Sequence, residues 1–499
     1  MVGVRRRRGP NQAAAFFSGA PVGNLAIPAR RAPRRFFGCS GKIATPRART
    51  VTIRGLLCCQ KNKMLKMSGA MSGTMSDRLF WPLRRWRALQ EKRFLAHVAN
   101  AARTDFYHRR IRPGRIKSLA DLALLPLTDK HQLALAGEAA FGCRRADIRE
   151  WVSTSGTTGK PLRVPLTPSD LHRLAENEAA ALHIAGLRAG DTLIIAVAMD
   201  RLFVAGLAYW LGAQRLGAAC MRVGPAFVSQ RDLLCSLLAG HPRNFVITVP
   251  SLLVDCERPA DRRAFRSLAA VIGIAEPLRS ADLAPNSLAQ RLTAIFAAPL
   301  LGTYASTETC TTFAEGPQCR GGHLNPSLAV VEILDERGLP AAPGIPGEVV
   351  VTPLGVRGMP LVRFRTGDIA ALFTEPCPCG RTTPRLGPIL GRRQQLLKVR
   401  GTSLFPAAIF DLLNSMPEVR DYLIVARKAH DLSDLLTLHV CLRDGKARTR
   451  QRLEQRARAI LKVTPRIVYA PAAEIRTLQT QANPRKPSKF VDLRSDGSE

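Results

Sequence analysis

Residues 153–161 read Ser153-Thr154-Ser155-Gly156-Thr157-Thr158-Gly159-Lys160-Pro161, and this stretch decides how the rest of the chain is interpreted. Its two glycines allow the backbone to turn N–H groups inward, its serines and threonines add hydroxyl donors, and Lys160 adds a positive charge. Such a loop is suited to holding phosphate. Its spacing is not that of a Walker P-loop, because proline rather than serine or threonine follows the lysine. The alternative interpretation is a flexible surface turn.

Further segments follow this loop in a recognisable order. They are Leu202-Phe203, Ala275-Glu276-Pro277, Tyr304-Ala305-Ser306-Thr307-Glu308, Pro360 to Asp368, Cys377-Pro378-Cys379-Gly380-Arg381, Gly391-Arg392 and Arg400 to Pro406. With the loop, they resemble the adenylate-forming superfamily of acyl-CoA synthetases, peptide-synthetase adenylation domains and luciferases, and in particular its phenylacetate-CoA ligase branch. The resemblance runs from about Phe94 to Arg494. Several blocks in the family's order are far more specific than any one block.

Strand-length apolar runs alternate with helical segments after the loop. We expect strands over 192–198, 245–249 and 271–274, and a helix over 206–216. This alternation predicts an α/β core with a mainly parallel sheet, whose ligands bind at the carboxyl ends of the strands. The resemblance implies the same fold class, with a large adenylation domain over 77–392 and a small mobile α+β domain over 393–499.

The ends of the large domain's first elements can also be predicted. Apolar residues recur at helical spacing from Trp81 to Val98 and predict a helix that ends near Ala102. Thr128 is expected to cap a later helix. These segments are interpreted as scaffold.

The formal charge is +36 and the pI is about 11.0, which raises the question of nucleic-acid binding. Residues 1–76 hold fifteen lysines and arginines and no acidic residue, so much of the excess charge lies in this basic leader. Elsewhere arginines are scattered without interleaved aromatic residues, which disfavours nucleic acid as a partner. The leader is interpreted as a disordered tail or a mis-annotated start, and an organellar transit peptide is the alternative. Candidate starts are Met64, Met67, Met71 and Met75.

No apolar run approaches the roughly 20 residues that a membrane span requires. Twelve cysteines without a secretory signal predict reduced thiols rather than a disulfide framework. We therefore expect a cytoplasmic protein, and leave open whether it forms a homodimer.

The resemblance assigns roles to residues around the nucleotide. Tyr304 would pack on adenine, Thr307 would lie near the phosphates, and Glu308 would bind the Mg²⁺ that bridges them. Mg²⁺ usually takes one or two carboxylates plus phosphate, which fits Glu308. Asp368 would accept hydrogen bonds from both ribose hydroxyls, and Arg392 would contact ribose or phosphate oxygens. The expected cofactor-binding set is Ser153, Thr154, Ser155, Gly156, Thr157, Thr158, Gly159, Lys160, Ala275, Glu276, Pro277, Tyr304, Asp368 and Arg392.

Four side chains form a candidate metal set. Cys319 and His323 lie at i and i+4, and Cys377 and Cys379 follow in a Cys-Pro-Cys-Gly stretch. Three cysteines and one histidine are the ligands that a structural Zn²⁺ prefers. Similar positions occur in phenylacetate-CoA ligase relatives, some of which bind zinc. Because the Cys-x-Cys spacing is tighter than usual, free thiols remain the alternative.

The C-terminal segment resembles the family's lysine-bearing ending. Aligning Val491 and Asp492 with that ending makes Lys486 the catalytic lysine, with Lys489 as the alternative. At the domain junction the family has two aspartates where this chain has Gln394 and Gln395. The hinge works by backbone torsion, so glutamine can still pivot, but the balance between the two domain orientations is put in doubt.

Together, the motifs and residue roles given by the resemblance imply an ATP-dependent acid–thiol ligase. Lys486, Glu308 and Thr307 would promote attack of a carboxylate on the α-phosphorus of ATP, with Mg²⁺ as a cofactor, and the acyl group would then pass to CoA. The alternative acceptor is the phosphopantetheine arm of an acyl carrier protein. An aryl acid such as phenylacetate is expected, and Phe203 either walls its pocket or belongs to the core. Two alternatives from other functional classes are a basic nucleic-acid-binding protein and a non-catalytic homologue of the family.

Overall fold

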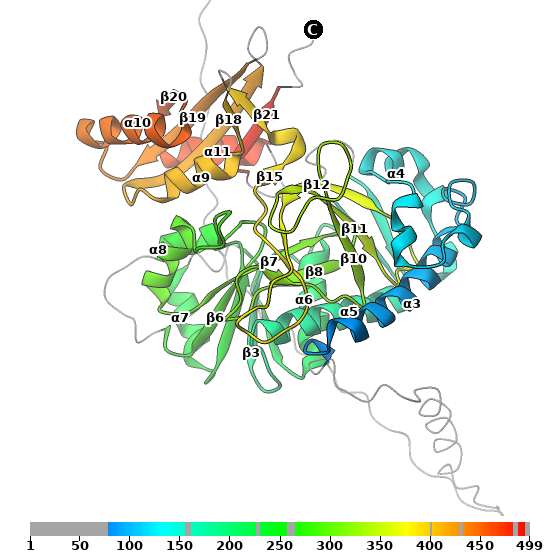
Figure 1. Ribbon diagram of the computed structural model, residues 1–499. Helices are drawn as coiled ribbons and strands as arrows, with labels where there is room; N and C mark the ends of the chain where they lie inside the picture. Colours follow the sequence, from blue (N-terminus) through cyan, green and yellow to red (C-terminus); the bar gives the residue numbers. More distant parts are fainter. Residues whose placement is uncertain are drawn as a thin grey trace, which may run out of the picture. The chain divides into compact units, whose positions relative to one another are not determined.

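The computed structural model describes residues 78–154, 161–225, 230–256, 265–399, 402–428, 433–482 and 488–494 (Figure 1). The chain divides into Met1–Met71 and Ser72–Glu499. The expected leader over 1–76 lies outside the described residues. So do Lys486 and the central part of the expected phosphate loop, which comprises Ser155, Gly156, Thr157, Thr158, Gly159 and Lys160.

The largest sheet has nine strands in the order β13-β14-β9-β8-β7-β6-β5-β3-β4. Its parallel part consists of β3 (Thr192–Ala196), β4 (Ala219–Arg222), β5 (Asn244–Thr248), β6 (Leu268–Gly273) and β7 (Leu300–Ser306). Its antiparallel part adds β8 (Thr311–Ala314), β9 (Gly322–His323), β13 (Leu372–Phe373) and β14 (Arg385–Leu386). The α/β class is confirmed, but the sheet is mixed, because the short strands after β7 fold back as antiparallel neighbours.

Helices cover both faces of the parallel part (Figure 1). One face packs against α5 (Pro168–Ile184) and α6 (Val204–Leu216), and the other against α7 (Arg231–Ala239) and α8 (Ser287–Phe296). Because both faces are covered, every residue of β3 and of β5 is buried. Such burial explains why these strands read as continuous apolar runs rather than as alternating ones.

A second sheet is antiparallel, in the order β10-β11-β12-β15. Its strands are β10 (Ala329–Leu334), β11 (Gly347–Pro353), β12 (Phe364–Ala370) and β15 (Gly391–Arg392). A separate hairpin joins β1 (Glu150–Ser153) to β2 (Arg163–Leu166). The expected phosphate loop is the connection of this hairpin.

The N-terminal helix α3 (Leu83–Ala101) ends where the sequence predicts, and α4 (Lys130–Ala136) follows later. Asp129, not Thr128, caps α4. The Asp129 carboxylate accepts from the Gln132 N–H at 2.8 Å, and the Gln132 side chain accepts in return from the Asp129 N–H. Thr128 instead bonds through its hydroxyl to that of Tyr107 at 2.8 Å, so it belongs to a buried contact inside the domain.

Residues from 397 onward build their own cores. The sheet β20-β19-β18-β21 comprises β18 (Val419–Lys428), β19 (Asp434–Leu442), β20 (Arg466–Tyr469) and β21 (Phe490–Leu493). One face packs on α9 (Pro406–Asn414) and α10 (Ala447–Leu461), and the other on α11 (Ala472–Ala482), while β16 (Leu397–Val399) and β17 (Thr402–Leu404) form a hairpin (Figure 1). This mixture of helices and strands agrees with the α+β class expected for residues 393–499. Among the described helices, none is long and apolar enough to cross a membrane.

Candidate active site

The base of the expected phosphate loop is held by hydrogen bonds at both ends. Ser153 ends β1, and its N–H donates to the carbonyl of Leu202 at 2.8 Å. The Thr154 N–H donates to the Leu162 carbonyl, and the Leu162 N–H returns to the Thr154 hydroxyl, both at 3.0 Å. Both Ser153 and Thr154 are buried. The hairpin therefore fixes where the loop leaves and re-enters the domain.

Three expected nucleotide contacts meet at one carboxylate. The Tyr304 hydroxyl on β7 donates to Oδ2 of Asp368 at 2.7 Å, and Nε of Arg392 lies 3.2 Å from Oδ1. Asp368 on β12 and Arg392 on β15 are direct partners in the strand register. Tyr304 and Asp368, which lie 64 residues apart in the sequence, thus meet in the fold.

Burial dominates the electrostatics of this cluster. Asp368 is 8% exposed, and burial raises the pKa of its carboxyl, while Arg392 and the Tyr304 hydrogen bond oppose that change. Burial likewise raises the pKa of Tyr304 well above its ordinary value. Tyr304 is therefore a neutral donor. A carboxylate offers about four acceptor positions, so Asp368 keeps capacity for sugar hydroxyls beside its two present donors.

The expected magnesium ligand has a partner that sequence reasoning missed. Oε1 of Glu308 lies 3.5 Å from Nζ of Lys130, the first residue of α4. The negative charge of Glu308 also contributes to the raised pKa values of Asp368 and Tyr304. Thr307 lies in the turn after β7, where its carbonyl accepts from the Cys310 thiol at 3.3 Å.

The Ala275-Glu276-Pro277 block begins two residues after Gly273, the carboxyl end of β6. Ala275 has a φ of +65°, a left-handed conformation that ordinary side chains disfavour. The Glu276 carboxylate accepts from the N–H of Ser251 at 2.8 Å and from its hydroxyl at 2.7 Å. Through these two bonds Glu276 holds the segment after β5.

Two residues with open roles can now be placed. Phe203 is half-buried and precedes the first residue of α6, so it is not part of the fully buried core. Lys489, the alternative lysine, places its Nζ 4.7 Å from the centre of the Tyr422 ring. This cation–π contact gives the Lys489 ammonium a place within the C-terminal part.

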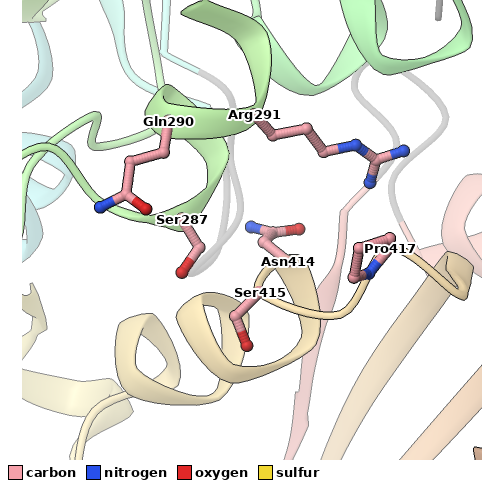
Figure 2. Close-up of a pocket in the computed structure, with 6 residues that line it drawn as sticks. All are labelled: Ser287, Gln290, Arg291, Asn414, Ser415 and Pro417. Carbon is pink, nitrogen blue, oxygen red and sulfur yellow. The ribbon is translucent and has the colours of Figure 1, made fainter. Parts of the chain in front are cut away.

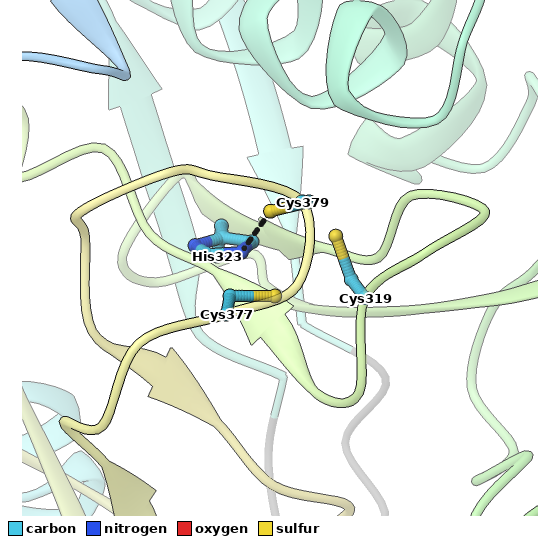
Figure 3. A group of neighbouring side chains, drawn as sticks. All are labelled: Cys319, His323, Cys377 and Cys379. Atoms are coloured by element: carbon cyan, nitrogen blue, oxygen red, sulfur yellow. Dashed lines mark hydrogen bonds between the residues drawn. The ribbon is translucent and has the colours of Figure 1, made fainter.

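The four expected metal ligands converge (Figure 3). The Sγ atoms of Cys319, Cys377 and Cys379 and a ring nitrogen of His323 all lie within 4.8 Å of one another. Nε2 of His323 is 3.2 Å from Sγ of Cys379, while Nδ1 bonds the Thr383 hydroxyl at 2.7 Å. Burial and two nearby arginines lower the pKa of His323 to about 4, so the ring is neutral.

This donor set fits zinc. Three thiols and a neutral imidazole held through its second nitrogen are the ligands and outer contact of a closed structural site. Cys377 and Cys379 sit on a turn closed by the Gly380 N–H, which donates to the Cys377 carbonyl at 2.9 Å. A zinc ion held by these four ligands would join the turn of Cys377 and Cys379 to β9, which carries His323, and to the segment before β9, which carries Cys319.

A cavity of about 280 Å³ lies away from these residues (Figure 2). Its lining comes from α8 and from the end of α9 and the segment beyond, namely Ser287, Gln290, Arg291, Asn414, Ser415 and Pro417. None of these belongs to the candidate set, so the cavity is separate from the cluster of Tyr304, Asp368 and Arg392.

A family model described as AMP-binding enzyme matches residues 141–357. With the α/β fold and the Tyr304–Asp368–Arg392 cluster, it defines the class: this is an adenylate-forming enzyme. A phenylacetate-coenzyme A ligase of Thermus thermophilus is 32% identical over 369 residues, which cover 71% of this chain and 81% of that protein. The chain therefore belongs to the phenylacetate-coenzyme A ligase family, and is an ATP-dependent, AMP-forming acid–CoA ligase.

Two solved structures of a 2-hydroxyisobutyryl-CoA ligase share the fold. In its postadenylation state the TM-score is 0.73, with 86% of this chain and 95% of that chain covered. In its thioesterification state, with CoA, the TM-score is 0.58, with 85% and 94% covered. Identity is 22% in both, so the likeness concerns the fold alone. None of these comparisons supports a carrier protein as the acceptor.

Proposed function

We propose that this ligase activates an aryl carboxylic acid of the phenylacetate type and passes the acyl group to CoA through an acyl adenylate. The observation that carries the proposal is the convergence of Tyr304 and Arg392 on the buried Asp368, while Glu308 follows by two residues the end of the strand that carries Tyr304. Such a cluster combines an aromatic ring, acceptors for ribose hydroxyls and a carboxylate for a metal. The Thermus thermophilus relative, named for phenylacetate, supports the acid class.

In the first half-reaction, a carboxylate oxygen of the acid attacks the α-phosphorus of ATP. A bond forms between this oxygen and phosphorus, the bond to the bridging oxygen breaks, and pyrophosphate leaves with the electron pair. Asp368 and Tyr304 would orient the nucleoside, and Lys486 would bridge the carboxylate and the α-phosphate. Such catalysis requires positioning and neutralisation of charge rather than a protein nucleophile.

Glu308 would hold the magnesium, whose contribution is to neutralise charge on the leaving pyrophosphate. In the described contacts the Glu308 carboxylate is already neutralised by Lys130 at 3.5 Å. If Glu308 held a divalent ion, Lys130 would give up this contact, and its ammonium would then pair with phosphate oxygens of the nucleotide. The 153–160 loop, anchored through Thr154, would hold the same phosphates.

In the second half-reaction, the CoA thiol attacks the acyl carbon of the mixed anhydride. The carbon–sulfur bond forms, the carbon–oxygen bond to phosphate breaks, AMP leaves with the electron pair, and the thiol proton passes to water. Lys486 is not required for this step, so the small domain can carry it away. A 2-hydroxyisobutyryl-CoA ligase of the same fold has been solved in both a postadenylation and a thioesterification state.

We further propose that Cys319, His323, Cys377 and Cys379 hold a structural zinc. Their convergence within 4.8 Å and the fixed ring of His323 support this. Four protein ligands leave no coordination position open for a substrate. The ion would therefore hold the Cys319–His323 segment against the Cys377–Cys379 turn without taking part in the reaction.

Acid-dependent exchange of pyrophosphate into ATP tests the function. The panel would compare phenylacetate with benzoate, hexanoate and palmitate, and the CoA step would be followed separately by thioester formation. We expect the highest kcat/KM with phenylacetate. Phe203→Ala should raise the KM for phenylacetate more than that for hexanoate, because a half-buried ring suits an aryl pocket. Equal kcat/KM across the panel would contradict the aryl assignment.

A further inference from the structure

Glu315 continues the pairing of β7 where the neighbouring strand β8 ends. β8 ends at Ala314, and the next residue, Glu315, bonds to both backbone groups of Gly302 on β7. The Glu315 N–H donates to the Gly302 carbonyl at 3.0 Å, and Oε2 of Glu315 accepts from the Gly302 N–H at 3.1 Å. Gly302 lies two residues before Tyr304 on the same strand. Glu315 therefore fixes the backbone of β7 close to the residue that donates to Asp368.

The other oxygen of the same carboxylate reaches the segment that carries two of the candidate metal ligands. Oε1 of Glu315 accepts from the N–H of Gly321, which lies midway between Cys319 and His323 in the sequence, at 3.0 Å. Nε of Arg279 donates to the same oxygen at 2.5 Å. The side chains of Arg279 and Glu315 are 14% and 6% exposed, so this ion pair is screened by salt much less than a surface pair.

Arg279 contacts the metal-ligand segment directly as well. Its Nη2 donates to the Cys319 carbonyl at 2.8 Å, and its Nη1 donates to the Leu283 carbonyl at 3.0 Å. One planar guanidinium thus holds a carboxylate and two carbonyls in different directions. A lysine ammonium, a single point charge on a flexible stem, does not reproduce this arrangement.

A continuous path therefore runs from the candidate metal ligands to the nucleotide cluster. Its members are joined by hydrogen bonds and, in the last step, by β7, in the order Cys319, Arg279, Glu315, Gly302 and Tyr304. All five residues are buried or half-buried. Packed and hydrogen-bonded groups of this kind can carry energetic coupling between two sites.

We propose that Arg279 and Glu315 are positioning residues that couple the metal centre to the nucleotide site. With zinc bound, residues 319–323 hold both side chains in place, and through them the backbone of β7. Without zinc, this segment loosens, Tyr304 is held less firmly, and ATP binds more weakly, while kcat at saturating ATP changes little. The inference rests on the proposed function, in which Tyr304 and Asp368 bind the nucleoside, and on the proposed zinc site.

A double-mutant cycle on the full chain tests this coupling. Its members are the wild type, Cys377→Ser, Arg279→Gln and the double variant. The readout is the dissociation constant of ATP with Mg²⁺, measured without an acid so that no reaction occurs, and zinc content and melting temperature are recorded for each protein. Arg243→Gln is the control, because Arg243 likewise joins a carboxylate, that of Asp191, to a carbonyl, that of Gly186, elsewhere in the large domain.

We expect Cys377→Ser to weaken ATP binding by roughly three- to tenfold when Arg279 is present, and by less than about twofold in the Arg279→Gln background. Arg279→Gln alone should keep its zinc and weaken ATP binding to a similar extent. Arg279→Lys should show an intermediate loss, and it replaces Arg279→Gln in the cycle if that variant does not fold. Arg243→Gln should bind ATP as the wild type does.

The inference is overturned if Cys377→Ser weakens ATP binding equally with and without Arg279, or does not weaken it at all. A wild type that contains no zinc overturns it as well. Losses of ATP binding that only follow the melting temperature, Arg243→Gln included, would leave the pair a merely structural role. If the wild type binds ATP but shows no exchange with any acid, the proposed ligase function fails instead, and the cycle still decides whether Arg279 couples the two sites.

Discussion

The Tyr304 hydroxyl donates a hydrogen bond to the Asp368 carboxylate at 2.7 Å, joining the large mixed sheet to the antiparallel sheet beside it. Each residue lies in a separate sequence block, and neither block shows by itself which partner it will meet. The bond fixes the orientation of a buried carboxylate whose remaining acceptor positions face the nucleotide in the proposed function. Several consequences of this arrangement can be measured.

Tyr304→Phe removes the donor and keeps the ring. We expect the KM for ATP in the exchange reaction to rise by about five- to tenfold, since one hydrogen bond to a charged group contributes about 1.5 kcal/mol. The KM for the acid should change little. Tyr469→Phe is the matched control, because Tyr469 lies on β20 in the C-terminal part. An unchanged KM for ATP in Tyr304→Phe would show that the bond does not position the nucleotide.

Lys130→Met removes the ammonium that neutralises Glu308. The free Mg²⁺ concentration for half-maximal exchange should then fall by about two- to fivefold, because a partly exposed ion pair of this kind is worth up to about 1 kcal/mol. The measurement is a Mg²⁺ titration at fixed ATP, with Lys117→Met, an exposed lysine of the same domain, as the control. A titration midpoint that does not move would mean that Glu308 is not the metal ligand.

Cys377→Ser tests the metal centre. The wild type should contain about one zinc per chain by elemental analysis, and the variant should lose it and melt several degrees lower. The kcat of the folded fraction should stay within about twofold, because a closed site takes no part in the chemistry. Cys143→Ser, a half-buried cysteine outside the cluster, should keep the zinc. Zinc-free wild-type protein with an unchanged melting temperature after chelation would refute the assignment.

A buried acid on α5 makes stability depend on pH. Glu178 is 2% exposed, its Oε1 accepts from Asn177 at 3.1 Å and from the Thr312 hydroxyl, and burial raises its pKa to about 7. The folded state therefore retains a proton that the unfolded state loses above its own pKa of about 4.5, so stability falls as the pH rises from about 4.5 to 7.

Glu178→Gln removes this penalty. Relative to the wild type, its unfolding free energy should rise between pH 5 and pH 8 by up to about 3 kcal/mol, which is the equivalent of the pKa change. Denaturant unfolding at the two pH values measures this difference. Glu176→Gln, on the same helix and less buried, is the control. A pH-independent difference would mean that Glu178 is ionised in the folded protein.

The sequence predicts the parts of the site that depend on local motifs. Tyr304, Glu308, Asp368 and the cysteines were identified because each sits in a block of distinctive order, and β3, β5 and β6 because strands buried on both faces read as apolar runs. The four metal ligands come from two segments about fifty residues apart, and the structure brings them together.

Contacts between distant segments were not predictable in the same way. Lys130 follows an unremarkable Leu-Thr-Asp stretch, and only the fold places its ammonium beside Glu308. The cap of α4 was misassigned because Thr128 and Asp129 are both good capping residues, and the tertiary bond to Tyr107 decides between them. The antiparallel half of the large sheet consists mainly of strands too short to leave a periodic signal.

Acid-dependent ATP–pyrophosphate exchange with phenylacetate, measured for the wild type, Lys486→Ala and Lys489→Ala, tests the central claim most directly. The account predicts robust exchange in the wild type and a loss of about a hundredfold or more in Lys486→Ala, because charge on the reacting phosphate is then not neutralised. Lys489→Ala should stay within about threefold, since its ammonium is engaged with the Tyr422 ring at 4.7 Å. Absence of exchange in the wild type with every acid tried would contradict the account.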